Sequence, residues 1–175
     1  MTESLRGHLL VAAPSLFDYF RRSVVLVIEH SDDGAMGVVL NRASETPVAE
    51  AVPTLAPLAD RDEPVYVGGP VAPEAVVALG DFDDPEEAAT PLIGSLGVLD
   101  PDHLEPELRH LRVYAGYAGW SSGQLDEEVE QGAWIVEEAT PADPFSGGDL
   151  WSAVLERKGG SFALLATMPA DPSLN

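Results

Sequence analysis

The feature that most constrains this fold is a pair of strand-like runs separated by a short loop. Ser23–Glu29 and Ala35–Asn41 are rich in Val, Leu and Ile, and the loop between them ends in Asp33-Gly34. Two β-rich runs joined by a loop that ends in Asp-Gly predict an antiparallel hairpin. The chain should therefore contain an antiparallel sheet.

Further short runs predict more strands. The 16 glycines and 15 prolines are scattered along the chain, as turns between many short elements require. Strands are predicted at Leu9–Ala13, Val65–Gly68, Val76–Leu79, Leu92–Val98, Arg112–Tyr117 and Trp134–Glu138. The segment Leu79–Pro91 is the most loop-like and should hold at most one turn of helix.

Two helices are marked by capping residues. Ser121, with Gln124 three residues on, resembles a capping box, and Gly132 should end that helix. Asp149 should cap the second helix, which Gly159 should end. Weaker helices are predicted over Val48–Leu58, with a break at Pro53, and over Asp102–Leu111. Strands outnumber helices without alternating with them, which favours an α+β fold with a mixed or mostly antiparallel sheet.

The charge of the chain restricts its partners. Its formal net charge is -21, from 30 acids and 9 bases. Residues 1–42 hold five acids and four bases, so nearly all the excess lies in residues 43–175. Binding to nucleic acid depends on Lys and Arg neutralising phosphates, so direct DNA binding ranks last among the functions considered. One interpretation is that the acids of residues 43–175 simply form a solvated surface. The other is that Arg21, Arg22 and Arg42 provide the only place where an anion could bind.

Other absences narrow the function further. There is no cysteine, which excludes thiolate metal sites, thiol nucleophiles and disulfides. No apolar run approaches the length of a membrane span or a secretory signal. We expect one cytoplasmic domain over residues 1–175, with no metal, no cofactor and no membrane contact. Glu29, His30, Asp32 and Asp33 could bind a metal, but as turn residues they are better explained by hydrogen bonds at the end of the hairpin.

Gly119-Trp120-Ser121-Ser122-Gly123 has the form of a hydrolase nucleophile elbow. In that class the catalytic histidine follows the serine in the chain. All four histidines here precede Ser121, so a helix cap explains this serine better.

The candidate binding site combines small residues, aromatics and an arginine. Glycines let a ligand or another backbone approach closely, and a helix start presents free N–H groups beside Trp120. Arg42 could bind a carboxylate or a phosphate, or it could pair with an acid of the chain itself. The hypothesis is that the fold brings these stretches, together with the Ser121 amide, to one shallow pocket. The candidate residues are Asn41, Arg42, Gly68, Gly69, Gly116, Tyr117, Gly119, Trp120 and Gln124.

Several motifs together resemble the YqgE/AlgH family over nearly the whole chain. They are Arg22-Ser23-Val24-Val25-Leu26, Glu29-His30, residues 34–42, Val67-Gly68-Gly69-Pro70-Val71, and Gly116-Tyr117-Ala118-Gly119-Trp120 followed by Gly123-Gln124-Leu125. The resemblance implies a compact α+β fold with a curved, barrel-like sheet in a bacterial cytoplasmic protein. It implies no reaction, since the family has no established activity and its regulator label rests on genetic effects. The chain departs from the family pattern at Asp126, Ala43 and Leu79-Gly80, where Glu, Pro and Leu-His are usual.

The leading hypothesis is a non-enzymatic binding or regulatory protein that acts through a protein partner or a small anionic ligand. The alternative is an enzyme that uses polar groups near Asn41, Arg42 and Trp120. A clustered set of His, Asp and Glu in a cleft would favour the enzyme, and a basic helical face would favour a DNA-binding repressor.

The acidic composition predicts a salt response. Crowded carboxylates repel one another at pH 7 and weaken the fold, and added salt screens that repulsion. We expect the Tm, followed by circular dichroism, to rise with moderate NaCl at pH 7. A flat or falling Tm would contradict the prediction.

Overall fold

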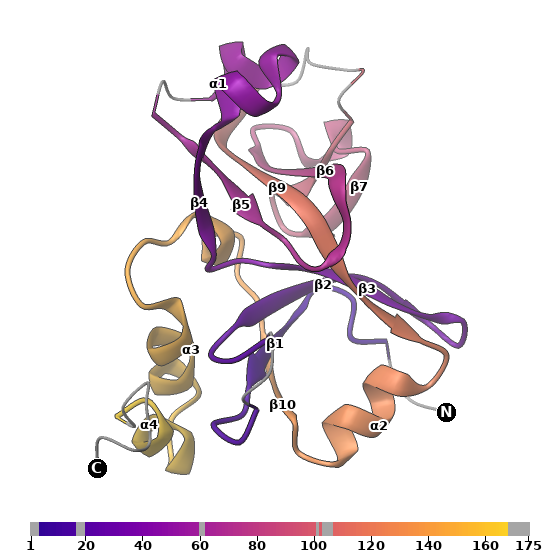
Figure 1. Cartoon of the computed structure of the whole chain (residues 1–175), viewed down its shortest axis with the longest axis vertical. Helices are drawn as coiled ribbons and strands as arrows, with labels where there is room; N and C mark the ends of the chain where they lie inside the picture. Colours follow the sequence, from indigo (N-terminus) through magenta and orange to yellow (C-terminus); the bar gives the residue numbers. More distant parts are fainter. Residues whose placement is uncertain (1–3, 17–19, 60–61, 101, 103–106, 168–175) are drawn as a thin grey trace.

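The computed structural model describes residues 4–16, 20–59, 62–100, 102 and 107–167. Within them one sheet contains all the strands (Figure 1). The strands are β1 (His8–Ala12), β2 (Val24–Ser31), β3 (Gly34–Val39), β4 (Ala43–Pro47), β5 (Pro64–Val67), β6 (Val71–Phe82), β7 (Thr90–Ile93), β8 (Leu96–Leu99), β9 (Leu108–Ser121) and β10 (Trp134–Glu138). The helices are α1 (Val48–Ala51), α2 (Gln124–Glu130), α3 (Leu150–Lys158) and α4 (Ser161–Leu165), with 3-10 turns η1 (Pro53–Leu58), η2 (Pro85–Glu87) and η3 (Asp143–Phe145).

The sheet is mostly antiparallel and forms an open, curled layer. Its main path runs β10-β1-β2-β3-β9-β6-β8-β7, and β5 joins β4 to β9. The β5–β9 pair is the parallel one among the strand pairs of the described residues. With its few short helices the chain has the predicted α+β fold.

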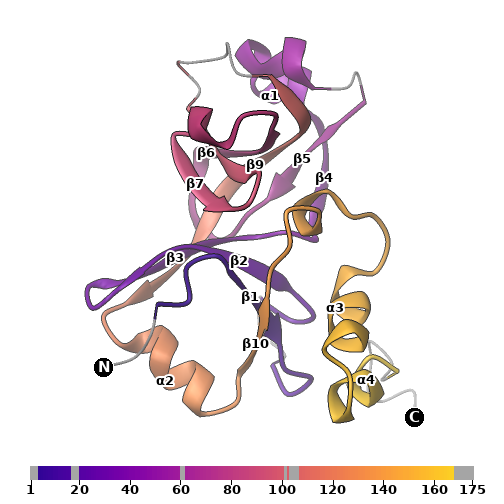
Figure 2. The ribbon, with the colours of Figure 1, turned by 180° about the vertical axis from the view of Figure 1, so that it is seen from behind.

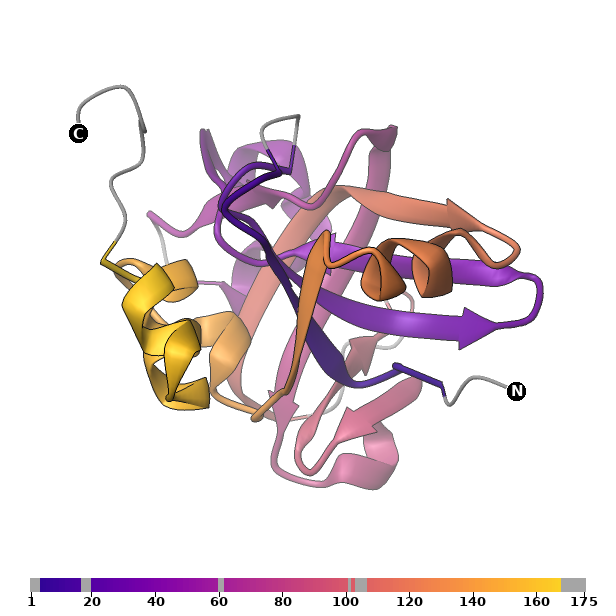
Figure 3. The same ribbon diagram turned by 90° about the horizontal axis from the view of Figure 1, so that it is seen from below.

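The helices cover different parts of the sheet. Helices α3 and α4 lie on one side of the β10-β1-β2 region, and α2 lies on the other side (Figures 1 and 2). Seen from below, the same strands separate the two helical regions (Figure 3). Helix α1 sits with β4 and β5 at the far end of the molecule. Trp151 of α3 is buried, and its indole N–H donates to the carbonyl of Ala12 at 2.8 Å.

Strand β9 links three clusters of buried side chains. Tyr114 belongs to the cluster under α3. Ala118 and Trp120 belong to the cluster under α2. Leu111 and Val113 belong to the cluster under α1 and η1. A strand of 14 residues can do this because successive side chains point to opposite faces and because the strand changes neighbours along its length.

The local sequence predictions are largely confirmed. Strands β2 and β3 form the predicted hairpin, with Ser31 paired to Gly34. The Asp149 side chain caps α3 by accepting from the Ser152 N–H, and Gly159 ends the helix. The segment 48–58 is helical and interrupted near Pro53, as expected.

Four predictions about element boundaries are wrong. Leu92–Val98 is two strands, because Gly94 turns with φ +52°. The residues predicted as a helix over Asp102–Leu111 are strand from Leu108 onward, while 103–106 lie outside the described residues. Residues 79–82 of the expected loop complete β6.

Ser121 does not cap α2, which is the fourth correction. It ends β9 opposite Gly34, and the cap position is Gly123. The Gln124 side chain instead reaches back and accepts from the Ser121 amide at 3.0 Å. Pairing with β3 therefore delays the start of the helix by two residues.

A close backbone crossing fixes the path of β9. Gly68 and Gly69 lie directly against Gly116 and Tyr117, and the Gly68 amide donates to the Ala115 carbonyl at 2.9 Å. Opposite Gly116, four residues of β6 interrupt the register between the pairs Val71–Tyr117 and Val76–Ala115. A Cβ on Gly116 would lie 2.5 Å from the Gly69 carbonyl oxygen. Only glycine leaves room for this crossing.

This crossing predicts a large cost for Gly116→Ala. Gly116 has φ +77°, and Gly132 has a matching φ of +81° with open space around it. We expect Gly132→Ala to lower the free energy of unfolding by about 1–2 kcal/mol, the cost of a left-handed alanine. Gly116→Ala should cost roughly 2–3 kcal/mol more because the backbone must also shift. Urea denaturation of both variants measures the difference, and equal losses would contradict the crossing.

Candidate functional site

Asn41 and Arg42 serve the backbone of the hairpin. The Asn41 side chain accepts from the Val24 amide at 3.1 Å and donates to the Arg22 carbonyl at 3.0 Å. The Arg42 guanidinium donates to the Arg21 carbonyl at 3.3 Å, and its own carbonyl accepts from Val67. These contacts fix the start of β2 and bring Arg42 beside β5.

The fold brings part of the predicted site together. The Gly68 carbonyl accepts from the Val39 amide at 2.8 Å, so Gly68 and Gly69 lie between the hairpin and β9. Gly116 and Tyr117 face them across the crossing. At this point two stretches of backbone pack directly on each other. The glycines make room for the chain itself, not for a ligand.

Trp120 and Gln124 are tied to another residue, Glu128 on α2. One carboxylate oxygen of Glu128 accepts from the indole N–H of Trp120 at 3.1 Å and from that of Trp134 at 2.9 Å. The other oxygen accepts from the Gln124 amide at 3.0 Å. Glu128 thus fastens α2 to β9 and β10.

The register of β3 and β9 separates Arg42 from the Trp120 region. Gly119 pairs with Met36 and Ser121 with Gly34, near the tip of the hairpin. From Gly34 to the end of β3 at Val39 the chain advances roughly 17 Å, at about 3.3 Å per residue. Arg42 lies beyond that point and binds Arg21, away from the tip. The Arg42 guanidinium and the Ser121 amide therefore do not form the single pocket of the hypothesis.

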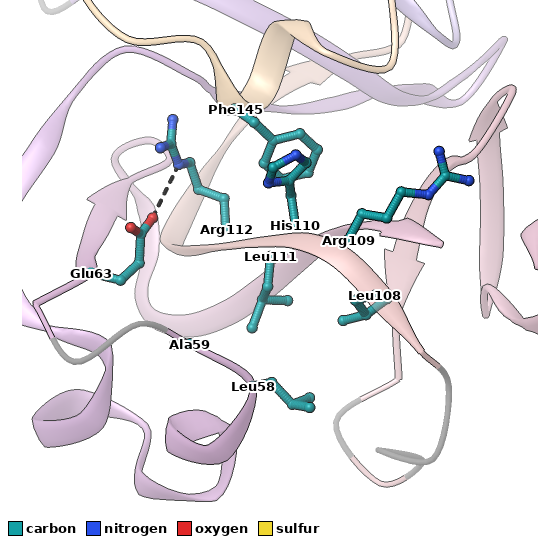
Figure 4. A pocket seen from close by; sticks show the side chains of 9 residues that line it. All are labelled: Leu58, Ala59, Glu63, Leu108, Arg109, His110, Leu111, Arg112 and Phe145. Carbon is teal, nitrogen blue, oxygen red and sulfur yellow. Dashed lines mark hydrogen bonds and ion pairs between the residues drawn. The ribbon is translucent and has the colours of Figure 1, made fainter. Parts of the chain in front are cut away.

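A pocket of about 240 Å³ lies instead along the first part of β9. Its lining residues are Leu58, Ala59, Glu63, Leu108, Arg109, His110, Leu111, Arg112 and Phe145 (Figure 4). Leu108 and Leu111 point toward Leu58, while His110 points the other way, toward Phe145 of η3 (Figure 4). The pocket therefore has an apolar side and a polar side.

A β-bulge produces this arrangement. Asp81 pairs with His110 and Phe82 with Leu108, so Arg109 is the extra residue of β9. A bulge re-aims neighbouring side chains and bends the strand. Leu108 and Leu111, three residues apart, both pack on the cluster under η1 as a result.

The two arginines extend to opposite ends of the pocket and differ in how firmly they are held (Figure 4). The Arg112 side chain is 13% exposed; it lies 3.4 Å from Glu63, donates to the Pro144 carbonyl at 2.7 Å and stacks on the Tyr66 ring at 4.3 Å. The Arg109 side chain is 56% exposed and meets Asp83 at 3.0 Å. Arg112 is thus fixed by the fold, while Arg109 can exchange its partner.

Between the arginines lies an aromatic wall. The His110 and Phe145 rings are 5.3 Å apart and tilted by 30°. Tyr114 is next in line on this face of β9, and burial raises the pKa of its hydroxyl well above the usual value, so it stays neutral. A group in the pocket would meet an imidazole, apolar side chains and two arginines that are paired with Glu63 and Asp83.

Sequence reasoning missed this pocket, although a signal was present. Residues 43–175 contain five bases, and two of them stand in Arg109-His110-Leu111-Arg112. The net charge of the long segment 43–175 conceals this local cluster of bases. The net charge of short windows along the sequence reveals it.

The fold and pocket define an α+β protein built on an open, curled sheet, with a pocket at its longest strand that is lined by a histidine and two ion-paired arginines. A model of the AlgH-like family matches residues 9–163. A UPF0301 protein of Streptomyces coelicolor is 44% identical, over 100% of this chain and 98% of its own length. The chain belongs to this AlgH-like, UPF0301 family of bacterial proteins.

Two solved structures agree with the fold. A crystal structure of a protein from Corynebacterium diphtheriae superimposes with a TM-score of 0.86 at 34% identity, covering 95% of this chain and 93% of that one. The solution structure of the AlgH protein from Pseudomonas aeruginosa gives 0.72 at 31% identity, covering 97% and 98%.

Two features are absent from the described residues. Across them no helix has the length and apolar character needed to cross a membrane. Nor does that part of the chain gather three or more His, Cys, Asp or Glu side chains in a way that could hold a metal ion.

The Glu128 contacts predict a structural role for this carboxylate. Glu128→Ala leaves two indole N–H groups of the core without acceptors, which should lower the free energy of unfolding by about 2–4 kcal/mol. Glu130→Ala, an exposed position on the same helix, should change it by less than about 0.5 kcal/mol. Urea denaturation followed by tryptophan fluorescence measures both, and equal effects would show that Glu128 is not a fastening residue.

Proposed function

We propose that this chain is a non-enzymatic binding protein of a regulatory kind that holds an acidic group of a protein partner or small ligand in the β9 pocket. The single observation behind the proposal is the gathering of Arg109, His110 and Arg112 around an apolar-sided pocket in a chain of net charge -21. Carboxylates and phosphates are the groups that arginines bind through paired N–H donors.

The relative strengths of the contacts favour exchange at Arg109. An exposed ion pair such as Arg109–Asp83 is worth about 0.2–1 kcal/mol. A carboxylate bound to the same exposed guanidinium gains a similar amount. An incoming carboxylate can therefore displace Asp83 at small cost, while Arg112, already oriented by three contacts, needs no reordering.

The other hypotheses have weaker support. An enzyme using Asn41, Arg42 and Trp120 would need free polar groups there, but Asn41 and Trp120 already bond within the fold. Direct DNA binding still ranks last because of the charge. We further propose that residues 1–175 act as one cytoplasmic domain, since the first and last strands of the described chain, β1 and β10, pair along their whole length.

Binding of a defined acidic probe tests the proposal. A short peptide with two adjacent glutamates, and separately inorganic phosphate, is titrated into the ¹⁵N-labelled protein. Amides of residues 108–112 should shift in a saturable way. Arg109→Gln should weaken binding by up to about fivefold, the loss of one exposed ion pair, and should leave the Tm nearly unchanged because Arg109 is exposed.

Arg21→Gln is the matched control, since it removes the same charge at an exposed position outside the pocket. Equal weakening in both variants would indicate a general charge effect and reject the site. Saturable binding of the probes without any shift at residues 108–112 would place the function elsewhere.

A further inference from the structure

His30 is a buried histidine with a different partner at each ring nitrogen. It lies near the end of β2, with Ala35 opposite it on β3, and its side chain is 5% exposed. Its Nδ1 accepts from the backbone N–H of Leu5 at 2.8 Å. Its Nε2 lies 3.3 Å from Oδ1 of Asp126 on α2. The ring thus stands between the N-terminal segment and α2.

The Leu5 contact requires a neutral imidazole. A nitrogen that accepts an N–H must carry a lone pair, so the hydrogen-bond network assigns the proton to Nε2. Protonation of Nδ1 would set two N–H groups against each other at hydrogen-bond distance. Protonation strengthens the Asp126 contact, because the contact becomes an ion pair only when the imidazole is charged.

We propose that His30 is a pH-sensitive latch: protonation releases Leu5 from the sheet and tightens the contact with Asp126. The latch has two states because Nδ1 can accept from the Leu5 amide only while it carries no proton. Histidine is the side chain whose charge changes most readily between about pH 5 and 8.

The surroundings of the ring support this exchange. Asp126 is the charged group that faces the ring from α2. Its Oδ1 is buried and has no hydrogen-bond partner in the described part of the chain, so the 3.3 Å approach of Nε2 is a close contact and not a hydrogen bond. From the N-terminal segment the group that faces the ring is the Leu5 amide, and from β3 it is the apolar Ala35. The described groups that face the ring are thus one carboxylate, one backbone amide and one methyl group, and the Arg6 guanidinium lies nearby on the Ile28 carbonyl.

The segment that the latch holds is short and otherwise anchored by its neighbours. Leu5 packs on the apolar cluster under α2. Arg6 donates to the carbonyls of Ile28 and Pro91, and the Gly7 amide donates to Val27 at 2.8 Å. Release should therefore free the Leu5 amide, while the Leu5 carbonyl still accepts from the His8 amide at 2.9 Å and the Ser4 hydroxyl still donates to the His30 carbonyl. The outcome is a Leu5 amide that is hydrogen-bonded at high pH and open to exchange at low pH.

Amide hydrogen exchange of the full chain tests the latch. The protection factor of the Leu5 amide should fall about tenfold or more between pH 8 and pH 5.5, and that of the Gly7 amide should not follow. His30→Asn keeps an acceptor where Nδ1 lies and does not titrate, so Leu5 should stay protected at both pH values.

His110→Asn is the control, because it removes an exposed histidine on another strand and should leave the Leu5 response unchanged. The proposal is overturned if protection of Leu5 in the unmodified chain does not depend on pH. It is also overturned if His30→Asn, folded by circular dichroism, still loses that protection at pH 5.5. The first of these results needs no variant.

Discussion

The backbone crossing of Gly68 and Gly69 over Gly116 is the constraint on which the rest of the structure depends. Before the crossing β9 pairs with β6 and β5, and after it β9 pairs with β3. Without this crossing the two halves of the sheet could not share a strand. The curl of the sheet and the separation of the three clusters of buried side chains both follow from it.

One strand therefore supplies two chemically different regions. Beyond the crossing, polar groups of β9 bond inward, as Trp120 does to Glu128, and the result is rigidity. Before it, the bulge at Arg109 turns polar groups outward, and the result is a pocket. This difference explains why the most unusual stretch of sequence, Gly116–Trp120, is structural, while the plainer stretch 108–112 lines the cavity.

The sequence predicted what depends on neighbouring residues and missed what depends on distant ones. The β2–β3 hairpin and the Asp149 cap follow from residues a few positions apart. The helix expected over 102–111 was wrong from Leu108 onward because Leu108 and Leu111 are three residues apart, a helical spacing that a β-bulge reproduces. The contacts of Arg112 with Glu63, Tyr66 and Pro144 span 32 to 49 positions, and no local pattern could predict them.

The charge of the chain also limits which acidic partner the pocket could accept. At physiological salt, charges more than about 8 Å apart are largely screened, so a ligand already in the pocket responds mainly to the pairs Arg109–Asp83 and Arg112–Glu63. An approaching polyanion, by contrast, meets the field of a chain with net charge -21 over a broad surface. A partner that presents one acidic group on a neutral or basic surface gains the local attraction without the broad repulsion. Such a partner suits this pocket better than a nucleic acid or a uniformly acidic protein, and the apolar side formed by Leu58, Leu108 and Leu111 favours an acidic group next to an apolar one.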